Sequence, residues 1–483
     1  MAQSKAQHRL LFGSKRVLWP FVAILKRHSA LLGLLAGGLL LRLVLLASAS
    51  SMPLQIVDEQ QYAKLATNLL HVHEFAFTSG ELTSMRPPLY PALVAALWKV
   101  GGTEDPQVVR AAQIVFSLLL VAATYLLALR LFNRRTAIAA AAIVCFYPSL
   151  LYAGLLVLTE IVFTVLVLVF VLLFVLLLER PKALWAVLMG ATLGLAALTR
   201  SVLWPFPVVF LPMLLLTVPG TAGTRAKVAV CCLLGFVAVV GPWSVRNTRL
   251  QQTFTVVDTM GGMNLRMGNY EYTPEDRMWD AVNLTGDKSW SYLLGQTRPD
   301  ALELTVGQKD KWAQHEAIAY MLANPGTTVR RSVLKFADFW GLEREMVAAL
   351  QQGLYAPPRW FAVVAIVAVV LAYPMVACGA AIGIFRAPPA DRRVHVLILA
   401  IILFITAVHS VVFGHSRYHL PLVPFLAIYA ATAWSSKSWR DFAISFRVAA
   451  GPAFLIAALL AAWSHEVLFR DADHIRMLLQ ALS

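Results

Sequence analysis

Long apolar stretches alternate with short polar ones along almost the whole chain. A helix that crosses the hydrocarbon core of a bilayer needs roughly 20 apolar residues. Eleven stretches approach that length, and they occupy residues 28–49, 107–132, 136–155, 161–179, 183–199, 202–219, 227–245, 359–385, 394–413, 420–436 and 447–464. The pattern predicts an all-α, polytopic membrane protein with about eleven transmembrane helices. A shorter stretch, 17–25, has basic residues at both ends and predicts a helix that lies in the membrane interface.

The basic residues indicate how these helices are oriented. They cluster between apolar stretches, and the cytoplasmic loops of membrane proteins carry such an excess of lysine and arginine. With the N-terminus in the cytoplasm, every cluster falls on the inner side; the clusters lie at 134–135, 180–182, 225–227, 386–393 and 437–447. We therefore predict a multi-pass membrane protein with its N-terminus in the cytoplasm.

Two long polar segments then face the external side, at about 50–106 and 246–358. The chain divides accordingly into an N-terminal transmembrane module (1–245), a non-cytoplasmic segment (246–358) and a C-terminal transmembrane module (359–483). In the second segment, helical sequence from Lys309 to Ala323 meets the breaker Asn324-Pro325-Gly326. A second helical run then continues through Trp340.

The first external segment is rich in polar groups. Asp58 and Glu59 open an amphipathic stretch whose apolar residues recur at helical spacing, namely Tyr62, Leu65, Ala66 and Leu69. Arg86 precedes Pro87-Pro88, and we expect these prolines to end one helix and begin another. An acid and a base on an external loop at membrane level suit an amphipathic substrate, although acids at helix starts also stabilise the helix dipole.

Composition supports a membrane protein and excludes some partners. Hydrophobic residues make up 59% of the chain and charged residues 14%, whereas soluble domains have about 25% charged residues. The net charge of +15 comes from the clustered basic residues, so we expect no nucleic acid partner. The histidines and the four cysteines lack metal-ligand spacing. We expect no cofactor and no metal site; a divalent cation is compatible with the sequence but not indicated by it.

Several short motifs together resemble a known family. They are DEQQY at 58–62, RPPLYP at 86–91, LTE at 158–160, ALTR at 197–200, GPWSVRN at 241–247, GGMNLRMGN at 261–269 and SRYHLPLVP at 416–424. In order and spacing the chain resembles the bacterial branch of the protein O-mannosyltransferase-like glycosyltransferases, a superfamily that includes the lipid A aminoarabinose transferases. The resemblance implies the membrane-embedded C-type glycosyltransferase (GT-C) fold.

The resemblance also implies roles for individual residues. Asp58 matches the aspartate that acts as general base, with Glu59 beside it, and Glu160 matches the family's second acidic position, which is an aspartate in the aminoarabinose transferases. The residues expected to bind the phosphate of a lipid donor are Arg86, Arg200, Arg246, Arg417 and Tyr418. Those expected to position the substrate are Tyr62, Tyr90, Asn269 and His415.

Bland alternatives exist for several of these side chains. Arg200 and Arg246 lie at external ends of predicted helices, where long basic side chains often snorkel toward water. Glu160 begins a predicted helix, so its charge also suits the helix dipole.

The implied activity is transfer of a sugar from a polyprenyl phosphate to a protein, lipid or glycan acceptor, with inversion at the anomeric carbon. The resemblance places this reaction at the outer face of the bacterial cytoplasmic membrane. A transporter or lipid flippase is the alternative, but such proteins tend to place ionisable residues at mid-membrane and to show half-chain repeats. The predicted spans have almost no charge at their centres. An inactive scaffold of the same fold is a third reading.

Overall fold

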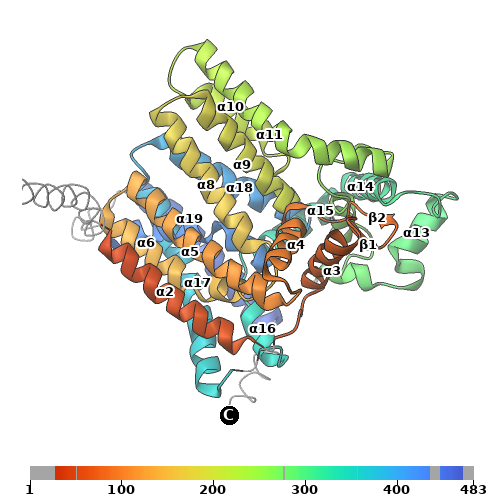
Figure 1. Ribbon diagram of the computed structural model, residues 1–483, viewed down its shortest axis with the longest axis horizontal. Coiled ribbons are helices and arrows are strands. Elements are labelled where there is room, and N and C mark those ends of the chain that lie inside the picture. The colour runs from red at the N-terminus through yellow and green to blue at the C-terminus, as the bar shows by residue number, and fades with distance from the viewer. Residues whose placement is uncertain (1–27, 51, 276–277, 356, 436–445, 471–483) are drawn as a thin grey trace, which may run out of the picture.

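The computed structural model describes residues 28–50, 52–275, 278–355, 357–435 and 446–470. Helices dominate it, and the apolar ones pack side by side as a bundle (Figure 1). The helices of this bundle are α2 (Ser29–Ser48), α5 (Pro106–Leu131), α6 (Arg134–Phe146), α7 (Pro148–Ala153), α8 (Glu160–Glu179), α9 (Ala183–Thr199), α10 (Pro207–Thr217), α11 (Ala222–Gln251), α17 (Arg359–Arg386), α18 (Arg392–Val411), α19 (Val423–Ser435) and α20 (Phe446–His465). The predicted all-α polytopic fold is confirmed.

The predicted count of eleven membrane-spanning helices is not confirmed. Within the described residues, seven helices are long and apolar enough to cross a membrane. The expected span 136–155 is interrupted at Tyr147, because Pro148 starts a separate short helix. The expected spans 202–219 and 420–436 each begin with 3-10 turns, η1 (Ser201–Leu203) and η4 (Ser416–Leu422), which leave shorter α-helices behind them. The expected interfacial helix at 17–25 lies outside the described residues.

Small residues let two bundle helices approach closely. A Cβ atom on Gly190 of α9 would lie 1.8 Å from the carbonyl oxygen of Cys232, and one on Gly235 of α11 would lie 2.2 Å from that of Val187. Only glycine fits at either position, and such close backbone packing is a common way to join helices within lipid. The contact fixes the end of α9, where Arg200 follows.

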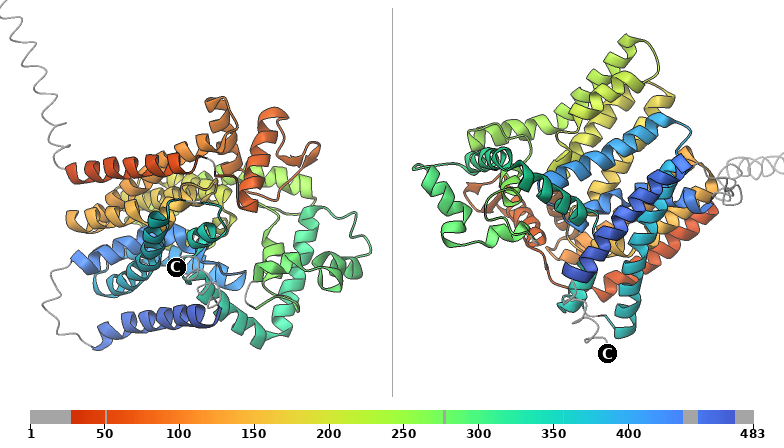
Figure 2. Two further views of the ribbon diagram at one scale, coloured as in Figure 1. Left: turned by 90° about the horizontal axis from the view of Figure 1, so that it is seen from below. Right: turned by 180° about the vertical axis from the view of Figure 1, so that it is seen from behind.

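The first external segment folds against one end of the bundle (Figure 2). It contains α3 (Val57–His71), the antiparallel strands β1 (Ala76–Thr78) and β2 (Glu81–Leu82), and α4 (Leu89–Gly101). The helix that begins near Asp58 is confirmed. The prolines 87–88 precede α4 as expected, but they do not end a helix, because α3 already ends at His71 and the hairpin intervenes.

The second external segment lies beyond the same end of the bundle (Figures 1 and 2). Its elements are α12 (Gly261–Met267), η2 (Met278–Asn283), η3 (Gly286–Lys288), α13 (Trp290–Thr297), α14 (Val306–Ala323), α15 (Pro325–Phe339) and α16 (Glu345–Gln351). The predicted helix–breaker–helix pattern around Asn324 is confirmed by α14 and α15. The two external segments are joined by a backbone hydrogen bond from Thr259 to Ser84, 3.0 Å long. Near the C-terminus, η6 (Glu466–Arg470) follows α20.

Candidate active site

A cavity of about 320 Å³ lies where the external segments meet the end of the bundle. Its charged and phenolic lining residues come from α3, the loop before α4, the start of α8, the end of α9, the loop before α12, α14 and η4; they are Asp58, Tyr62, Arg86, Glu160, Arg200, Asp258, Asp310, Lys311, Arg417 and Tyr418. Seven of the twelve residues predicted for the site line this cavity.

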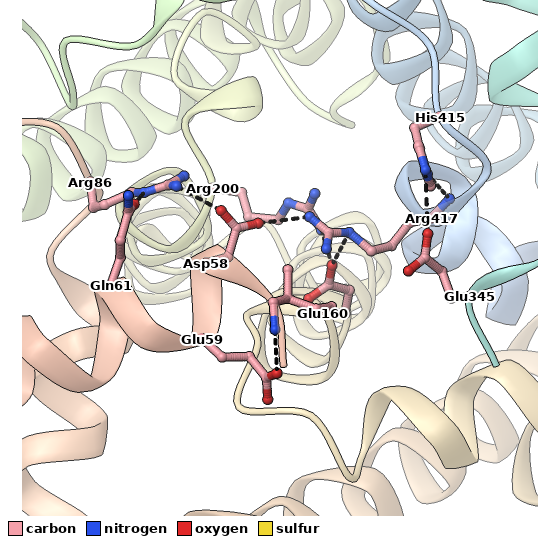
Figure 3. A network of polar contacts seen from close by, with 10 residues as sticks. Asp58, Glu59, Gln61, Arg86, Glu160, Arg200, Glu345, His415 and Arg417 are labelled. Carbon is pink, nitrogen blue, oxygen red and sulfur yellow. Dashed lines mark hydrogen bonds and ion pairs between the residues drawn. The ribbon is translucent and has the colours of Figure 1, made fainter. Parts of the chain in front are cut away.

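Asp58 is the centre of a network of ion pairs (Figure 3). One of its oxygens, Oδ1, accepts a hydrogen bond from Nη2 of Arg86 at 2.6 Å, and Oδ2 accepts one from Nη2 of Arg417 at 2.8 Å. Residues 58, 86 and 417 are far apart in the sequence but meet at one point. Arg86 is held in turn by Oε1 of Gln61, 2.7 Å from its Nε, so the DEQQY motif supplies both partners of this guanidinium.

Glu160 forms the second acidic position of the network. Its Oε1 lies 3.2 Å from Nε of Arg417 and 3.3 Å from Nη1 of Arg200. Among the described residues, its buried Oε2 has no hydrogen-bond partner, and the buried Nη1 of Arg200 has the ion pair with Oε1 but no hydrogen bond. Buried polar atoms normally find partners, so these two atoms are available to a ligand.

The network has a net positive charge. The carboxylates of Asp58 and Glu160 face the guanidinium groups of Arg86, Arg200 and Arg417, and two negative charges against three positive ones leave +1. Tyr418 lies under two of these cations, with ring-centroid distances of 5.2 Å to Arg200 and 5.5 Å to Arg417. Guanidinium groups suit phosphate oxygens because their planar fork presents paired donors. The arrangement can bind an anion.

The arginines also set the ionisation of Asp58. Burial raises the pKa of the Asp58 carboxyl, but the charges of Arg86 and Arg417 outweigh this effect and bring the pKa below its ordinary value. Asp58 is therefore a carboxylate at neutral pH. At Tyr62 the effect of burial is larger than that of the nearby arginines, and the pKa rises to about 12. This phenol therefore stays protonated and can donate a hydrogen bond.

A second group of acids lines the cavity from the external segment. Asp258 accepts a hydrogen bond from the backbone N–H of Met260 at 3.3 Å, and Asp310 accepts one from that of Met263 at 2.9 Å. Burial raises the pKa of both carboxyl groups, that of Asp310 to about 6. The sequence did not single out either residue. The only available signal was their place in a segment predicted to face the cavity side of the bundle.

Apolar side chains form part of the cavity wall on the flank of the bundle. Phe254 and Trp204 line the cavity and are 66% and 40% exposed. Exposed aromatic residues at the membrane boundary suit contact with lipid. The cavity thus combines a cationic centre with an apolar edge.

Two predicted residues of the first half of the chain lie outside the cavity lining. Glu59 is fully buried, and its carboxylate accepts hydrogen bonds from the backbone N–H groups of Gln55, Ile56 and Val157 at 2.8–3.1 Å. Figure 3 shows it turned away from Asp58. The hydroxyl of Tyr90 is buried and donates to Gln113 at 3.0 Å. Both side chains fix the local structure next to the cavity.

The other three lie on the rim of the site or beyond it. Arg246 donates to the carbonyl oxygen of Thr83 at 2.6 Å and stacks on Trp243, 4.6 Å from the ring centroid. Asn269 donates to the carbonyl oxygens of Leu265 and Val411. His415 does not line the cavity; its Nδ1 accepts a hydrogen bond from the backbone N–H of Arg417.

The chain resembles a described family over part of its length. Residues 85–245, about a third of the chain, match the family model of dolichyl-phosphate-mannose-protein mannosyltransferases. This region contains Arg86, Glu160 and Arg200, so the resemblance expected from the motifs is confirmed there. None of the curated proteins matches the chain in sequence.

Solved structures match over most of the chain. The oligosaccharyltransferase AglB from Archaeoglobus fulgidus, in complex with an inhibitory peptide and a dolichol-phosphate, matches at 14% identity with a TM-score of 0.46, covering 91% of this chain and 55% of AglB. ArnT from Cupriavidus metallidurans, bound to undecaprenyl phosphate, matches at 16% identity with a TM-score of 0.48, covering 92% of this chain and 67% of ArnT. The chain spans about half the length of the archaeal protein.

Proposed function

We propose that this protein is a glycosyltransferase that moves a sugar from a polyprenyl phosphate to a hydroxyl-bearing acceptor, with Asp58 as the general base. The observation that supports this most is the position of Asp58, held between the guanidinium groups of Arg86 and Arg417 at a cavity with an apolar edge. The matching family model, which describes transferases that use a dolichyl-phosphate sugar, supports the same reaction class.

The cationic groups suit the leaving group of such a reaction. When the bond between the anomeric carbon and the phosphate oxygen breaks, the electron pair stays with the phosphate, and negative charge grows on its oxygens. Arg86 and Arg417, with Arg200 beside them, stabilise this charge through charge-assisted hydrogen bonds in a site of restricted water access. No general acid is needed, because the lipid phosphate leaves as a stable anion.

Donor binding and base activation are coupled in this arrangement. Asp58 gives both of its oxygens to arginines, and a phosphate that competes for these guanidinium groups frees a carboxylate oxygen for the acceptor hydroxyl. Loss of an ion pair also raises the pKa of Asp58, which makes it a stronger base. The acceptor oxygen then attacks the anomeric carbon while its proton passes to Asp58.

The stereochemistry and the side of the membrane follow from the same proposal. A single displacement by the acceptor inverts the configuration at the anomeric carbon. The basic clusters at 134–135, 180–182, 225–227 and 386–393 lie at or next to helix ends opposite the cavity, where Arg130 pairs with Glu179 and Arg393 donates to the carbonyl oxygen of Thr217. The fifth cluster, at 437–447, lies largely outside the described residues. The positive-inside rule then puts the cavity on the external face of a bacterial cytoplasmic membrane.

The experiment is mass spectrometry of envelope lipids, glycans and proteins from cells with the gene, without it, and with the variant Asp58→Asn. The proposal expects loss of one defined sugar modification on deletion, recovered by the wild-type gene but not by the variant. An identical envelope in all three strains, with the protein present in the membrane, contradicts the proposal. Full recovery by Asp58→Asn instead favours a scaffold or a transporter.

A further inference from the structure

Arg417 lies between two histidines that are each paired with a glutamate. Two residues before it, His415 places Nε2 3.3 Å from Oε1 of Glu345. Two residues after it, His419 places Nε2 3.0 Å from Oε1 of Glu343. Both histidines belong to the η4 region and both glutamates to the short stretch from Gly341 to the start of α16, so the two pairs join the same two segments on either side of Arg417.

The Glu343–His419 pair is built into the interior. His419 is fully buried and Glu343 is 8% exposed. The carboxylate also accepts hydrogen bonds from the hydroxyls of Tyr147 at 2.8 Å and Ser149 at 2.5 Å. The ring of His419 stacks on Tyr373 with 4.5 Å between centroids. These contacts join η4 to the start of α7 and to α17.

The hydrogen bonds of His419 determine where its protons lie. Nδ1 is 2.6 Å from the carbonyl oxygen of Phe339, and a carbonyl oxygen only accepts, so Nδ1 carries a hydrogen. The short contact between Nε2 and Glu343 then requires one more proton shared between them, since two lone pairs would repel each other. The pair is thus a directional, charge-assisted contact that an apolar substitution does not reproduce.

The Glu345–His415 pair has a defined direction too. Nδ1 of His415 accepts a hydrogen bond from the backbone N–H of Arg417 at 3.1 Å, so Nε2 is the nitrogen that donates to Glu345. This histidine therefore caps the N–H of the second residue of η4 and ties that cap to α16. It fixes the backbone of Arg417 directly.

Both pairs lie directly behind the active site. A second cavity, of about 20 Å³, is lined by Glu343 and Glu345 together with Glu160 and Arg417. None of the four paired side chains lines the larger cavity. They are therefore placed to act on the site through Arg417 and not through contact with substrate.

We propose that Glu343, His419, Glu345 and His415 are positioning residues that hold Arg417 in reach of Asp58 and Glu160. The assignment rests on the proposed transferase function for its catalytic meaning. Its physical reason is the length of the arginine side chain: the guanidinium reaches Asp58 at 2.8 Å and Glu160 at 3.2 Å only from a fixed backbone position. Fixing η4 two residues before and two residues after Arg417 removes freedom that the long side chain otherwise has.

The consequence is measurable at Asp58. Arg417 is one of the three cations that lower the pKa of this carboxyl, with Arg86 and Arg200, so displacement of Arg417 raises that pKa. The acidic limb of a pH–rate profile reports protonation of the base. It therefore moves to higher pH when the positioning pairs are lost.

The test compares Glu343→Gln/Glu345→Gln with wild-type protein in lipid nanodiscs. We expect kcat/KM at pH 7.5 to fall by about 10- to 100-fold, as for other small displacements of a reacting group. We expect the acidic limb to move up by about one pH unit, and a cryo-EM structure to show the Arg417–Asp58 contact broken. His415→Gln, at the partly exposed pair, is the second variant should the double variant not fold, and smaller changes in the same directions are expected of it.

Glu466→Gln is the matched control. Glu466 is also a buried carboxylate, and it binds the same stretch through the N–H of Leu342 and through Arg344. Its loss therefore tests whether removal of any buried carboxylate that holds this stretch has the same effect on Asp58. We expect a lower melting temperature with an unchanged acidic limb. An intact Arg417–Asp58 contact in the double variant, or a limb that moves equally in the control, overturns the assignment. Absence of transfer by the wild-type protein rejects the proposed function, whereas the cryo-EM distance judges the positioning by itself.

Discussion

Asp58 and Asp310 line the same cavity, yet the pKa of Asp58 is lowered and that of Asp310 is raised. The pKa of Asp58 is below its ordinary value because, although burial raises it, Arg86 and Arg417 outweigh burial. The pKa of Asp310 rises to about 6, mainly because of burial, with nearby Asp258 adding to the rise. The difference lies in the neighbours: three arginines, from the bundle end and the first external segment, lie near Asp58, whereas Asp310 in the second external segment lies near another acid, Asp258.

This contrast divides the cavity into two walls. The bundle wall is formed by the bundle end together with the first external segment. It contains Asp58, Arg86, Glu160, Arg200 and Arg417, has a net positive charge and suits a phosphate. The external wall, which includes Asp258 and Asp310, offers carboxylate acceptors that suit hydroxyl or amino groups. We expect the bundle wall to carry the chemistry common to such enzymes and the external wall to select what is transferred or accepted.

We expect the largest effect on the transfer rate from replacing Asp58, the proposed general base. Asp58→Asn keeps the shape of the side chain but removes its ability to take a proton, so we expect transfer to fall by about 10²- to 10⁴-fold. The measurement is the rate of sugar transfer by purified protein. Undecaprenyl phosphate binding should persist in the same variant, because the arginines remain and a competing negative charge is gone. Retention of more than about half of the activity would falsify the assignment of Asp58 as base.

The next largest effect separates two arginines that the sequence placed in one group. Arg86→Gln removes a cation that lines the cavity, and we expect undecaprenyl phosphate to bind about 10- to 100-fold more weakly, the usual loss for a charge-assisted hydrogen bond. Arg246→Gln is the control, since Arg246 stacks on Trp243 outside the cavity. Its Kd should stay within about threefold of wild type. Binding titrations in nanodiscs measure both, and equal losses would contradict the division into walls.

A smaller effect of a different kind is expected on the external wall. Asp258→Asn removes a charged acceptor but not a cation, so we expect kcat/KM for transfer to fall by about 5- to 10-fold. Undecaprenyl phosphate should bind equally well or more tightly, because a negative charge near Arg86 is lost. Parallel transfer and binding assays measure both quantities. Weaker phosphate binding in this variant would show that the external wall also holds the phosphate.

The sequence was informative where chemistry is carried by short motifs next to helix ends. Asp58, Arg86, Glu160 and Arg417 each stand within such a motif, and the apolar pattern correctly put all four on one side of the bundle. Helical periodicity likewise predicted α3, α14 and α15. These features are local, so one sequence contains them.

The sequence was less informative where tertiary packing determines which way a side chain points. Asp58 and Glu59 are adjacent acids at a helix start, and only the fold shows that Glu59 is used by backbone N–H groups while Asp58 faces the cavity. Asp310 reaches the cavity because α14 lies against α12, which depends on Gly262: a Cβ atom there would be 1.9 Å from the carbonyl oxygen of Asp310. The count of eleven spans is not confirmed, and hydropathy cannot detect the turn at Tyr147, which divides one expected span into two helices.

The last effect concerns stability and not catalysis, and it tests the opposite pKa shifts of Asp58 and Asp310 from the side of Asp310. The pKa of Asp310 is raised from 3.8 to about 6, so its contribution to stability is fully present below about pH 4 and is lost as the pH rises through 6. Asp310→Asn avoids this loss while its amide oxygen still accepts the N–H of Met263. We expect the variant to be more stable at pH 7.5 by up to about 3 kcal/mol, with the advantage shrinking as the pH falls from 6 toward 4.

Asp391→Asn is the contrasting control, because a hydrogen bond from Arg393 lowers the pKa of Asp391. Loss of this carboxylate should lower the melting temperature at neutral pH and have a smaller effect in acid. Melting temperatures across this pH range decide the matter, since an Asp310→Asn advantage that does not depend on pH cannot come from the buried charge.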